Sequence, residues 1–194
     1  MLGKSLRNRR STALSELHGQ SYRGKSHIGE MQNLVFGPPP DGPAVSGSAV
    51  LAELSNASFD VLLASQVEQD MWQKWVFIAS SAGITSLMRG AVGDIVEAGG
   101  ASLAEQLVEE CSAIAAANGH PPSEESRKRT LVMLTAPGSP MTTSVFRGIE
   151  AGNRIEADHI IGDLIQRAPN TIDPSLLHIV LVALKTYEAR QLGL

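Results

Sequence analysis

The sequence predicts a mainly α protein, a bundle of five or six helices over about residues 65–191 that follows a short β region. Apolar residues recur every three to four positions in the segments after residue 66, which is the spacing of one helix face. Glycine and proline divide this region into lengths typical of globular helices. Before residue 64 the apolar runs are short and are bounded by glycine and proline, as strands are.

The front third of the chain combines strands with a proline-rich break. Residues 26–29 and 32–37 are extended runs that predict strands of a hairpin. The segment 38–43, with four prolines in six residues, interrupts regular structure and predicts a linker. A small amphipathic helix over 46–56 and a short strand over 59–63 follow.

The helical part opens with its longest segment, residues 67–89, in which Met71, Trp75 and Ile78 share one face. Residues 90–100 then predict a turn or a short helix. The later helices are separated by residues that stop or start helices, such as Gly119 ahead of a Pro-Pro pair. These helices are predicted at 101–118, 123–134, 141–150, 153–168 and 174–191, the last with Pro174 at its first position.

Composition excludes several classes of protein. One cysteine, Cys111, excludes a disulfide framework and a cysteine-based zinc cluster. The longest strongly apolar runs, such as 179–184, are too short to span a bilayer, so no membrane partner is expected. No two of the 18 glycines are separated by a single residue, so the G-x-G of the dinucleotide fingerprint is missing. The glycine-rich phosphate loop is missing as well.

Charge is unevenly distributed along the chain. Residues 1–25 carry six basic residues and one acidic residue, whereas residues 26–194 carry ten basic and nineteen acidic residues. A basic start is typical of a transit peptide, of a nucleic-acid-binding arm or of a solvated chain end. No aromatic residues interleave with the basic run and no apolar signal core follows it, which favours the solvated end. We therefore expect a cytoplasmic protein with no nucleic-acid partner.

Lys74 is the first candidate for chemistry, because it lies in the most apolar helix beside Trp72, Trp75 and Phe77. A lysine in an apolar site loses its charge readily and can then donate or accept a proton. The alternative is a lysine at the rim of a helix face, with its stem on apolar surface and its ammonium in water.

Ser144 and Glu156 are the other candidates. The hydroxyl of Ser144 could bind an anionic or hydroxylated ligand, or it could cap a helix. Glu156 and His159 are three residues apart and share a helix face, which suits an acid–base pair or an ordinary solvated surface. His159 has no second histidine at the spacing of metal ligands, so no metal site is expected.

The order of several segments resembles the C-terminal domain of the ketopantoate reductase (2-dehydropantoate 2-reductase) family, over about residues 20–191. The resemblance implies a bundle of the 6-phosphogluconate dehydrogenase C-terminal type. It also implies that residues 1–43 are the remnant of a nucleotide-binding domain and residues 44–194 the substrate and dimerisation domain. The matching segments are 70–79 (DMWQKWVFIA), 84–89 (ITSLMR), 93–95 (GDI), 109–119 (EECSAIAAANG), 135–144 (TAPGSPMTTS), 154–162 (RIEADHIIG) and Tyr187-Glu188.

The resemblance also implies roles for the three candidates. Lys74 matches the lysine that protonates the carbonyl oxygen of a 2-oxo acid as hydride arrives from NADPH. Ser144 matches the serine that binds the substrate carboxylate. Glu156 matches a glutamate that contacts the cofactor. A developing alkoxide does need a nearby proton and positive charge.

The sequence departs from the family pattern at three positions. Many members carry asparagines where this chain has Ile78 and Ala82, and an aspartate where it has Gly148. Isoleucine cannot hydrogen-bond a substrate hydroxyl as an amide does, although Ser81 lies near the same face. These departures leave the identity of the 2-oxo acid open.

Two functions remain. One is the substrate half of an NADPH-dependent reductase of 2-dehydropantoate. We expect this half to be inactive by itself, because the glycine-rich loop is absent. Its partners would be the 2-oxo acid and either a nucleotide-binding domain or a second copy of the chain. The other is a non-catalytic helical module, derived from the same family and used for dimerisation or binding.

Overall fold

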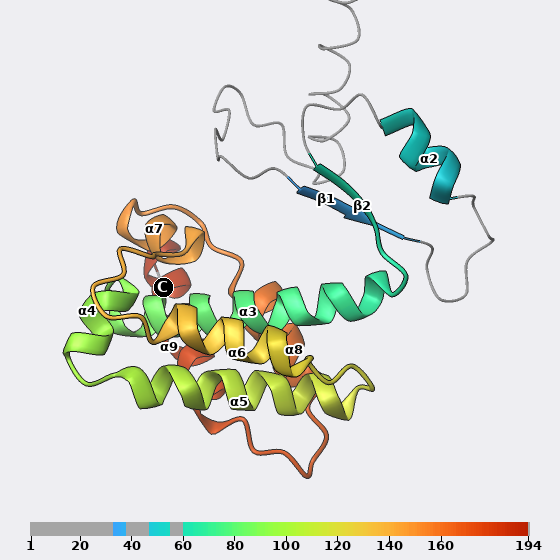
Figure 1. Ribbon diagram of the computed structural model, residues 1–194. Coiled ribbons are helices and arrows are strands. Elements are labelled where there is room, and N and C mark those ends of the chain that lie inside the picture. The colour runs from blue at the N-terminus through green and yellow to red at the C-terminus, as the bar shows by residue number, and fades with distance from the viewer. Residues whose placement is uncertain (1–32, 38–46, 55–59, 194) are drawn as a thin grey trace, which may run out of the picture.

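The computed structural model describes residues 33–37, 47–54 and 60–193. Within these residues a small β–α–β unit precedes a larger helical body (Figure 1). The basic segment 1–25 and the expected strand at 26–29 lie outside the described residues. The predicted mainly α fold, with a short β region ahead of a helical bundle, is confirmed.

The β–α–β unit consists of β1 (Asn33–Phe36), α2 (Gly47–Leu54) and β2 (Asp60–Leu63). The two strands are parallel, with Leu34 opposite Val61 and Phe36 opposite Leu63. Parallel strands need a crossover connection, and α2 lies within that connection (Figure 1). The two paired strands therefore lie on opposite sides of the domain boundary expected between residues 43 and 44.

The helical body is arranged around α3 (Val67–Met88), which contacts α4, α5, α6, α7, α9 and η1. Helices α5 and α6 lie in front of it in Figure 1, and α9 lies behind. One π-helical turn, η1, interrupts the α-helical pattern. The remaining elements are α4 (Val92–Glu97), α5 (Ala101–Ala117), α6 (Glu124–Leu134), α7 (Ser144–Glu150), η1 (Asp158–Gly162), α8 (Asp163–Gln166) and α9 (Ser175–Gln191). No helix among the described residues is long and apolar enough to cross a membrane.

The core forms where α3 carries its smallest side chains. Residues 79–83 (ASSAG) are all buried, and α5 and α9 pack against this stretch. A Cβ placed on Gly83 would lie 3.3 Å from Leu107 Cδ1 of α5 and 3.5 Å from Val180 Cγ2 of α9. Small side chains therefore let two neighbouring helices approach α3 closely.

Several helix ends follow the sequence closely. Gly119 has φ +85° and closes α5, with the amide of His120 donating to the carbonyl of Ala115 at 2.9 Å. This is the Schellman arrangement that a glycine after a helix favours. Ser123 caps α6 by accepting a hydrogen bond from the amide of Ser126 at 3.1 Å.

Three other ends differ from the expected positions. Helix α9 begins at Ser175, because the Glu110 carboxylate of α5 accepts from the amides of Leu176 (3.1 Å) and Leu177 (2.9 Å) and Pro174 lies just outside the helix. Helix α7 begins at Ser144 rather than 141, because the Thr143 side chain caps it. The helix expected from residue 153 begins only at Ala157, directly ahead of η1, because Gly152 lies in a turn (φ +70°) and residues 153–156 are not helical.

The start of α4 is built against the loop that precedes α7. The amide of Val92 donates to the carbonyl of Met141 at 3.0 Å, and that of Gly93 donates to Ser139 at 2.8 Å. A Cβ on Gly93 would lie 2.5 Å from the backbone nitrogen of Ser139 and 2.6 Å from the carbonyl carbon of Gly138. Only glycine fits this contact without displacing the loop.

Gly93→Ala should lower the free energy of unfolding by about 1–3 kcal/mol, because backbone atoms rather than a flexible side chain would have to move. Gly148→Ala in α7 is the matched control, since its Cβ would meet only Ile155 Cγ2 at 3.5 Å. Alanine is the better helix former by about 1 kcal/mol, so the control should keep or gain stability. Urea unfolding of the two variants measures this, and an equal loss in both would contradict the packing described.

Cys111 of α5 is fully buried in the core, and it is the single cysteine of the chain. Burial raises the pKa of its thiol to about 12, because a thiolate cannot be solvated there. The folded protein therefore keeps this thiol protonated at a pH where the unfolded chain ionises it.

Stability should consequently fall as the pH rises above the ordinary thiol pKa of 9.0. Between pH 8 and pH 10 the loss attributable to Cys111 is about 1.4 kcal/mol, the cost of one pH unit of ionisation. The measurement is the difference in unfolding free energy between the unsubstituted chain and Cys111→Ala at the two pH values. A difference that does not change with pH would show that the thiol ionises equally in both states.

Candidate functional site

Lys74 lies on α3 with its side chain exposed, at the edge of a hollow of about 410 Å³ between α3 and α6. Its ammonium makes no hydrogen bond or ion pair with any described residue, so it is available to a ligand. The hollow is kept in shape by Gln73, whose Oε1 accepts from the Ser123 hydroxyl at 2.9 Å. Its lining residues are Asp70, Gln73, Lys74, Phe77, Ser123, Ser126, Arg129, Thr130 and Met133.

Ser144 is the first residue of α7 and is exposed. Ser144 does not cap α7. The cap is its neighbour Thr143, whose hydroxyl accepts from the amide of Phe146 at 3.3 Å. The Thr143 hydroxyl also contacts the Thr85 hydroxyl of α3 at 2.9 Å. The start of α7, with Ser144, is thereby attached to α3.

Glu156 is exposed and lies just before η1. Its backbone carbonyl accepts from the amide of Ile160 at 3.1 Å, and its carboxylate has no partner among the described residues. The indole Nε1 of Trp75 donates to the carbonyl of Ile160 at 2.9 Å. This bond attaches the Glu156 segment to α3 at the residue next to Lys74.

Helix α3 thus holds the segments of all three candidate residues, although their side chains do not bond to one another. Lys74 and Thr85 share one face of α3 and are about 16 Å apart along its axis. Ile78 lies one turn beyond Lys74 on that face and is half-buried. Ser81 is buried, and its hydroxyl donates to the carbonyl of Phe77 at 2.7 Å, so its single proton is already engaged.

Of the two alternatives for Glu156 and His159, the acid–base pair is not present. His159 Nδ1 instead lies 3.6 Å from the carboxylate of Asp163, one turn further along, and both side chains are largely exposed. Asp158 of the same segment is bonded to Lys185 of α9 at 2.7 Å. Among the described residues no group of three histidine, cysteine or carboxylate side chains could hold a metal ion.

Sequence reasoning missed Thr85, Thr143 and Trp75 as residues that fix the site. Helical spacing alone places Thr85 on the face of Lys74, three turns away, so that signal was available. The partner of each residue depends on tertiary packing, which no local pattern encodes. The indole bond of Trp75 also needs the π-helical turn, which sequence reasoning did not anticipate.

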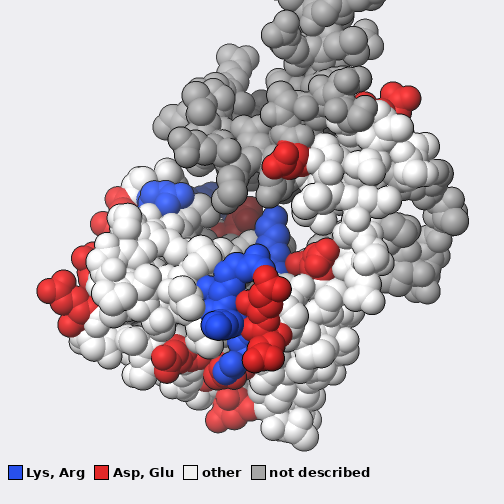
Figure 2. Space-filling view, in the orientation of Figure 1, with Lys and Arg blue, Asp and Glu red and all other residues white. Residues whose placement is uncertain are grey.

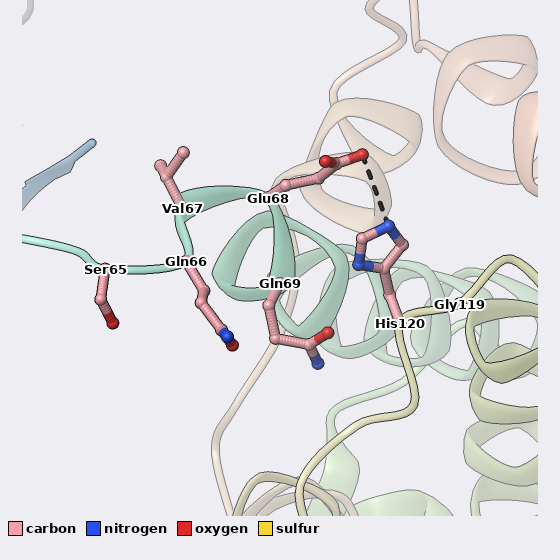
Figure 3. Close-up of a pocket in the computed structure, with 7 residues that line it drawn as sticks. All are labelled: Ser65, Gln66, Val67, Glu68, Gln69, Gly119 and His120. Atoms are coloured by element: carbon pink, nitrogen blue, oxygen red, sulfur yellow. Dashed lines mark ion pairs between the residues drawn. The ribbon is translucent and has the colours of Figure 1, made fainter. Parts of the chain in front are cut away.

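A second hollow, of about 330 Å³, lies at the start of α3 beside the turn after α5 (Figure 3). His120 lies there, with Nε2 3.4 Å from the Glu68 carboxylate. The His120 ring stacks on Trp72 at 5.5 Å. None of the three candidate residues lines this hollow.

The face drawn in Figure 2 carries Lys and Arg side chains interleaved with Asp and Glu. Arg127 pairs with Glu109 of α5, and Arg129 pairs with Glu125 within α6 at 3.1 Å. Charges of both signs therefore meet on this face, rather than forming a field of one sign.

Replacing Trp75 with phenylalanine should loosen η1 and the Glu156 segment, because the bond to the carbonyl of Ile160 is lost. We expect amide hydrogen exchange over residues 158–162 to become faster by about three- to tenfold, as the loss of one hydrogen bond implies. Trp72→Phe is the matched control, since the Trp72 indole N–H has no partner among the described residues. Unchanged exchange in Trp75→Phe would show that α3 does not hold this segment.

The helical body is similar to that of known proteins. The family model described as "Ketopantoate reductase PanE/ApbA C terminal" matches residues 66–188. The "Uncharacterized oxidoreductase YkpB" of Bacillus subtilis (strain 168) is 29% identical over 168 residues, which are 85% of this chain and 55% of that protein. This chain spans about half the length of the relatives it matches.

Two solved structures show the same fold. The 2-dehydropantoate 2-reductase of Methylococcus capsulatus is 25% identical, with a TM-score of 0.71 over 83% of this chain and 56% of that one. The dimeric ketopantoate reductase of Staphylococcus aureus is 21% identical, with a TM-score of 0.67 over 77% of this chain and 53% of that one. The chain therefore belongs to the ketopantoate reductase family and contains its C-terminal domain.

Proposed function

We propose that this chain is the substrate-binding half of an NADPH-dependent reductase that converts a 2-oxo acid, in the family's case 2-dehydropantoate, to the 2-hydroxy acid. The observation that carries the proposal is the arrangement around α3, which holds an unpaired lysine, an exposed serine and an unpaired glutamate on segments fastened to one helix. When bound, the cofactor would supply the hydride that adds to C2 of the substrate.

Lys74 has the role of general acid in this proposal. Its ammonium has no partner among the described residues, so its charge can stabilise the oxyanion that develops at the substrate carbonyl. Transfer of one proton from Nζ to that oxygen completes the alcohol and leaves a neutral amine. A positioned acid of this kind contributes about 10²–10⁴ to the rate.

Ser144 and Glu156 bind rather than react. The Ser144 hydroxyl is exposed and can donate to the substrate carboxylate. The Glu156 carboxylate is exposed and can accept hydrogen bonds from the hydroxyl groups of NADPH, so its chemistry fits the assigned contact. No G-x-G occurs in the chain, so the pyrophosphate must be bound by residues outside it.

The β–α–β unit supports a nucleotide-binding half ahead of the bundle. Parallel sheets are normally covered on both faces, and a two-stranded pair is not stable by itself. In this chain Val35 is 43% exposed and Leu62 54% exposed, which leaves apolar surface for further strands and helices. We therefore place the division of the chain after β2, near residue 65, where the match to the family begins.

The departures from the family pattern bear on the substrate. Ile78 and Ala82 present no hydrogen-bonding group, and the hydroxyl proton of Ser81 is engaged within its own helix. We expect the chain to recognise the 2-oxo acid group more strictly than a hydroxyl on the rest of the substrate. A non-catalytic dimerisation module is the second candidate function, favoured by these same replacements and by the dimeric relative from Staphylococcus aureus.

Lys74→Ala separates the two functions. The chain would be joined, from residue 65 onward, to the nucleotide-binding half of the Methylococcus capsulatus enzyme, and oxidation of NADPH by 2-dehydropantoate would be followed. We expect the substitution to lower kcat by about 10²–10⁴, because the proton donor is lost.

Lys128→Ala is the matched control, because Lys128 is an exposed lysine of α6 that pairs with no described residue and does not line the hollow. The unjoined chain should show no turnover, since it has no glycine-rich loop. Equal turnover by Lys74→Ala and Lys128→Ala would refute the role of Lys74. A joined protein that folds, binds NADPH and has no activity with any 2-oxo acid would favour the non-catalytic module.

A further inference from the structure

We propose that Thr85 is a positioning residue, which sets the place and direction of Ser144 through a chain of hydrogen bonds that runs from the buried Thr85 of α3 to the partly buried start of α7. The inference rests on the proposed function, because it takes Ser144 as the contact for the substrate carboxylate. Thr85 does not touch the substrate in this account; it acts through Thr143 and the first turn of α7.

The direction of each hydrogen bond follows from counting protons. The Thr85 hydroxyl lies 2.7 Å from the carbonyl of Ser81, which can only accept, so the one proton of Thr85 is donated there. The Thr85 and Thr143 hydroxyls are 2.9 Å apart, so Thr143 must donate to Thr85. The Thr143 oxygen, which keeps both lone pairs when it donates, accepts from the amide of Phe146 at 3.3 Å.

This chain of bonds is a polar link between α3 and α7 that is buried at its α3 end and partly buried at its α7 end. Thr85 is 0% exposed, so a bond lost there is not replaced by water. The other polar link, from Arg89 at the end of α3 to Glu150 at the end of α7 (3.1 Å), is about half exposed on both sides and contributes little.

Helix α7 cannot hold its own position. It is 7 residues long and contains Gly148, and isolated helices of that length are not stable. Its orientation is therefore set by its attachments, and the Thr85–Thr143 contact is made at the residue immediately before Ser144. A hydrogen bond also fixes the orientation of the helix relative to α3, because it needs a defined geometry, whereas apolar packing alone does not.

The test measures the dissociation constant of 2-dehydropantoate from the full chain by saturation-transfer NMR titration. Thr85→Val should raise it about three- to tenfold, the effect of one buried hydrogen bond, whereas Thr85→Ser should bind within about twofold of the unsubstituted chain. Thr143→Gly removes the same bond from the α7 side, and glycine is well tolerated at an N-cap. Thr186→Val is the matched control, because Thr186 makes the same bond to its own helix, to the carbonyl of Val182 at 2.8 Å, on the exposed side of α9.

A double substitution distinguishes positioning from a general loss of structure. With Ser144→Ala already present, Thr85→Val should weaken binding no further, because there is no hydroxyl left to position. Equal weakening in both backgrounds, or none in either, would overturn the inference. If Ser144→Ala weakens binding and neither Thr85→Val nor Thr143→Gly does, only the inference is wrong. If the unsubstituted chain does not bind, or Ser144→Ala binds as well as the unsubstituted chain, the proposed role of Ser144 is wrong and the inference falls with it.

Discussion

The close packing of α3 against α5 and α9 is the constraint on which the rest of the structure depends. It is possible because residues 79–83 carry the small side chains ASSAG, so that Leu107 and Val180 reach the surface of Gly83. Towards its start the same helix is less buried, and Lys74 is exposed there. Thr85 lies in the buried part of the helix, and the shorter elements α6, α7 and η1 contact α3.

Directional polar bonds then determine where the shorter elements sit. The indole of Trp75 fixes η1, the hydroxyl of Thr85 fixes α7, and the amide of Gln73 fixes the start of α6. Each bond comes from α3 and reaches a segment that is distant in sequence. Apolar packing stabilises the helical body, whereas these hydrogen bonds fix the relative positions of the segments that carry the candidate residues.

Much of this could be predicted from the sequence, because caps and breakers act locally. Gly119 and Ser123 mark the boundary of two helices as expected. The start of α9 could not be predicted, because its cap is the carboxylate of Glu110 from another helix. The parallel pairing of β1 with β2 could not be predicted for the same reason, since the relative direction of two strands depends on a long-range partner and not on the composition of either strand. Local chemistry indicates the candidate residues Lys74, Ser144 and Glu156, whereas the order of the motifs implies their roles.

The central claim is that the exposed part of α3 around Lys74, together with the segments of Ser144 and Glu156, binds a 2-oxo acid. Chemical-shift mapping on the ¹⁵N-labelled chain tests this most directly. Adding 2-dehydropantoate should shift the amide signals around residues 74–78, 143–146 and 156–160 together, with one shared saturation curve. Shifts confined to the hollow at Ser65–Gln69 and His120, or shifts that follow no single binding curve, would contradict the account.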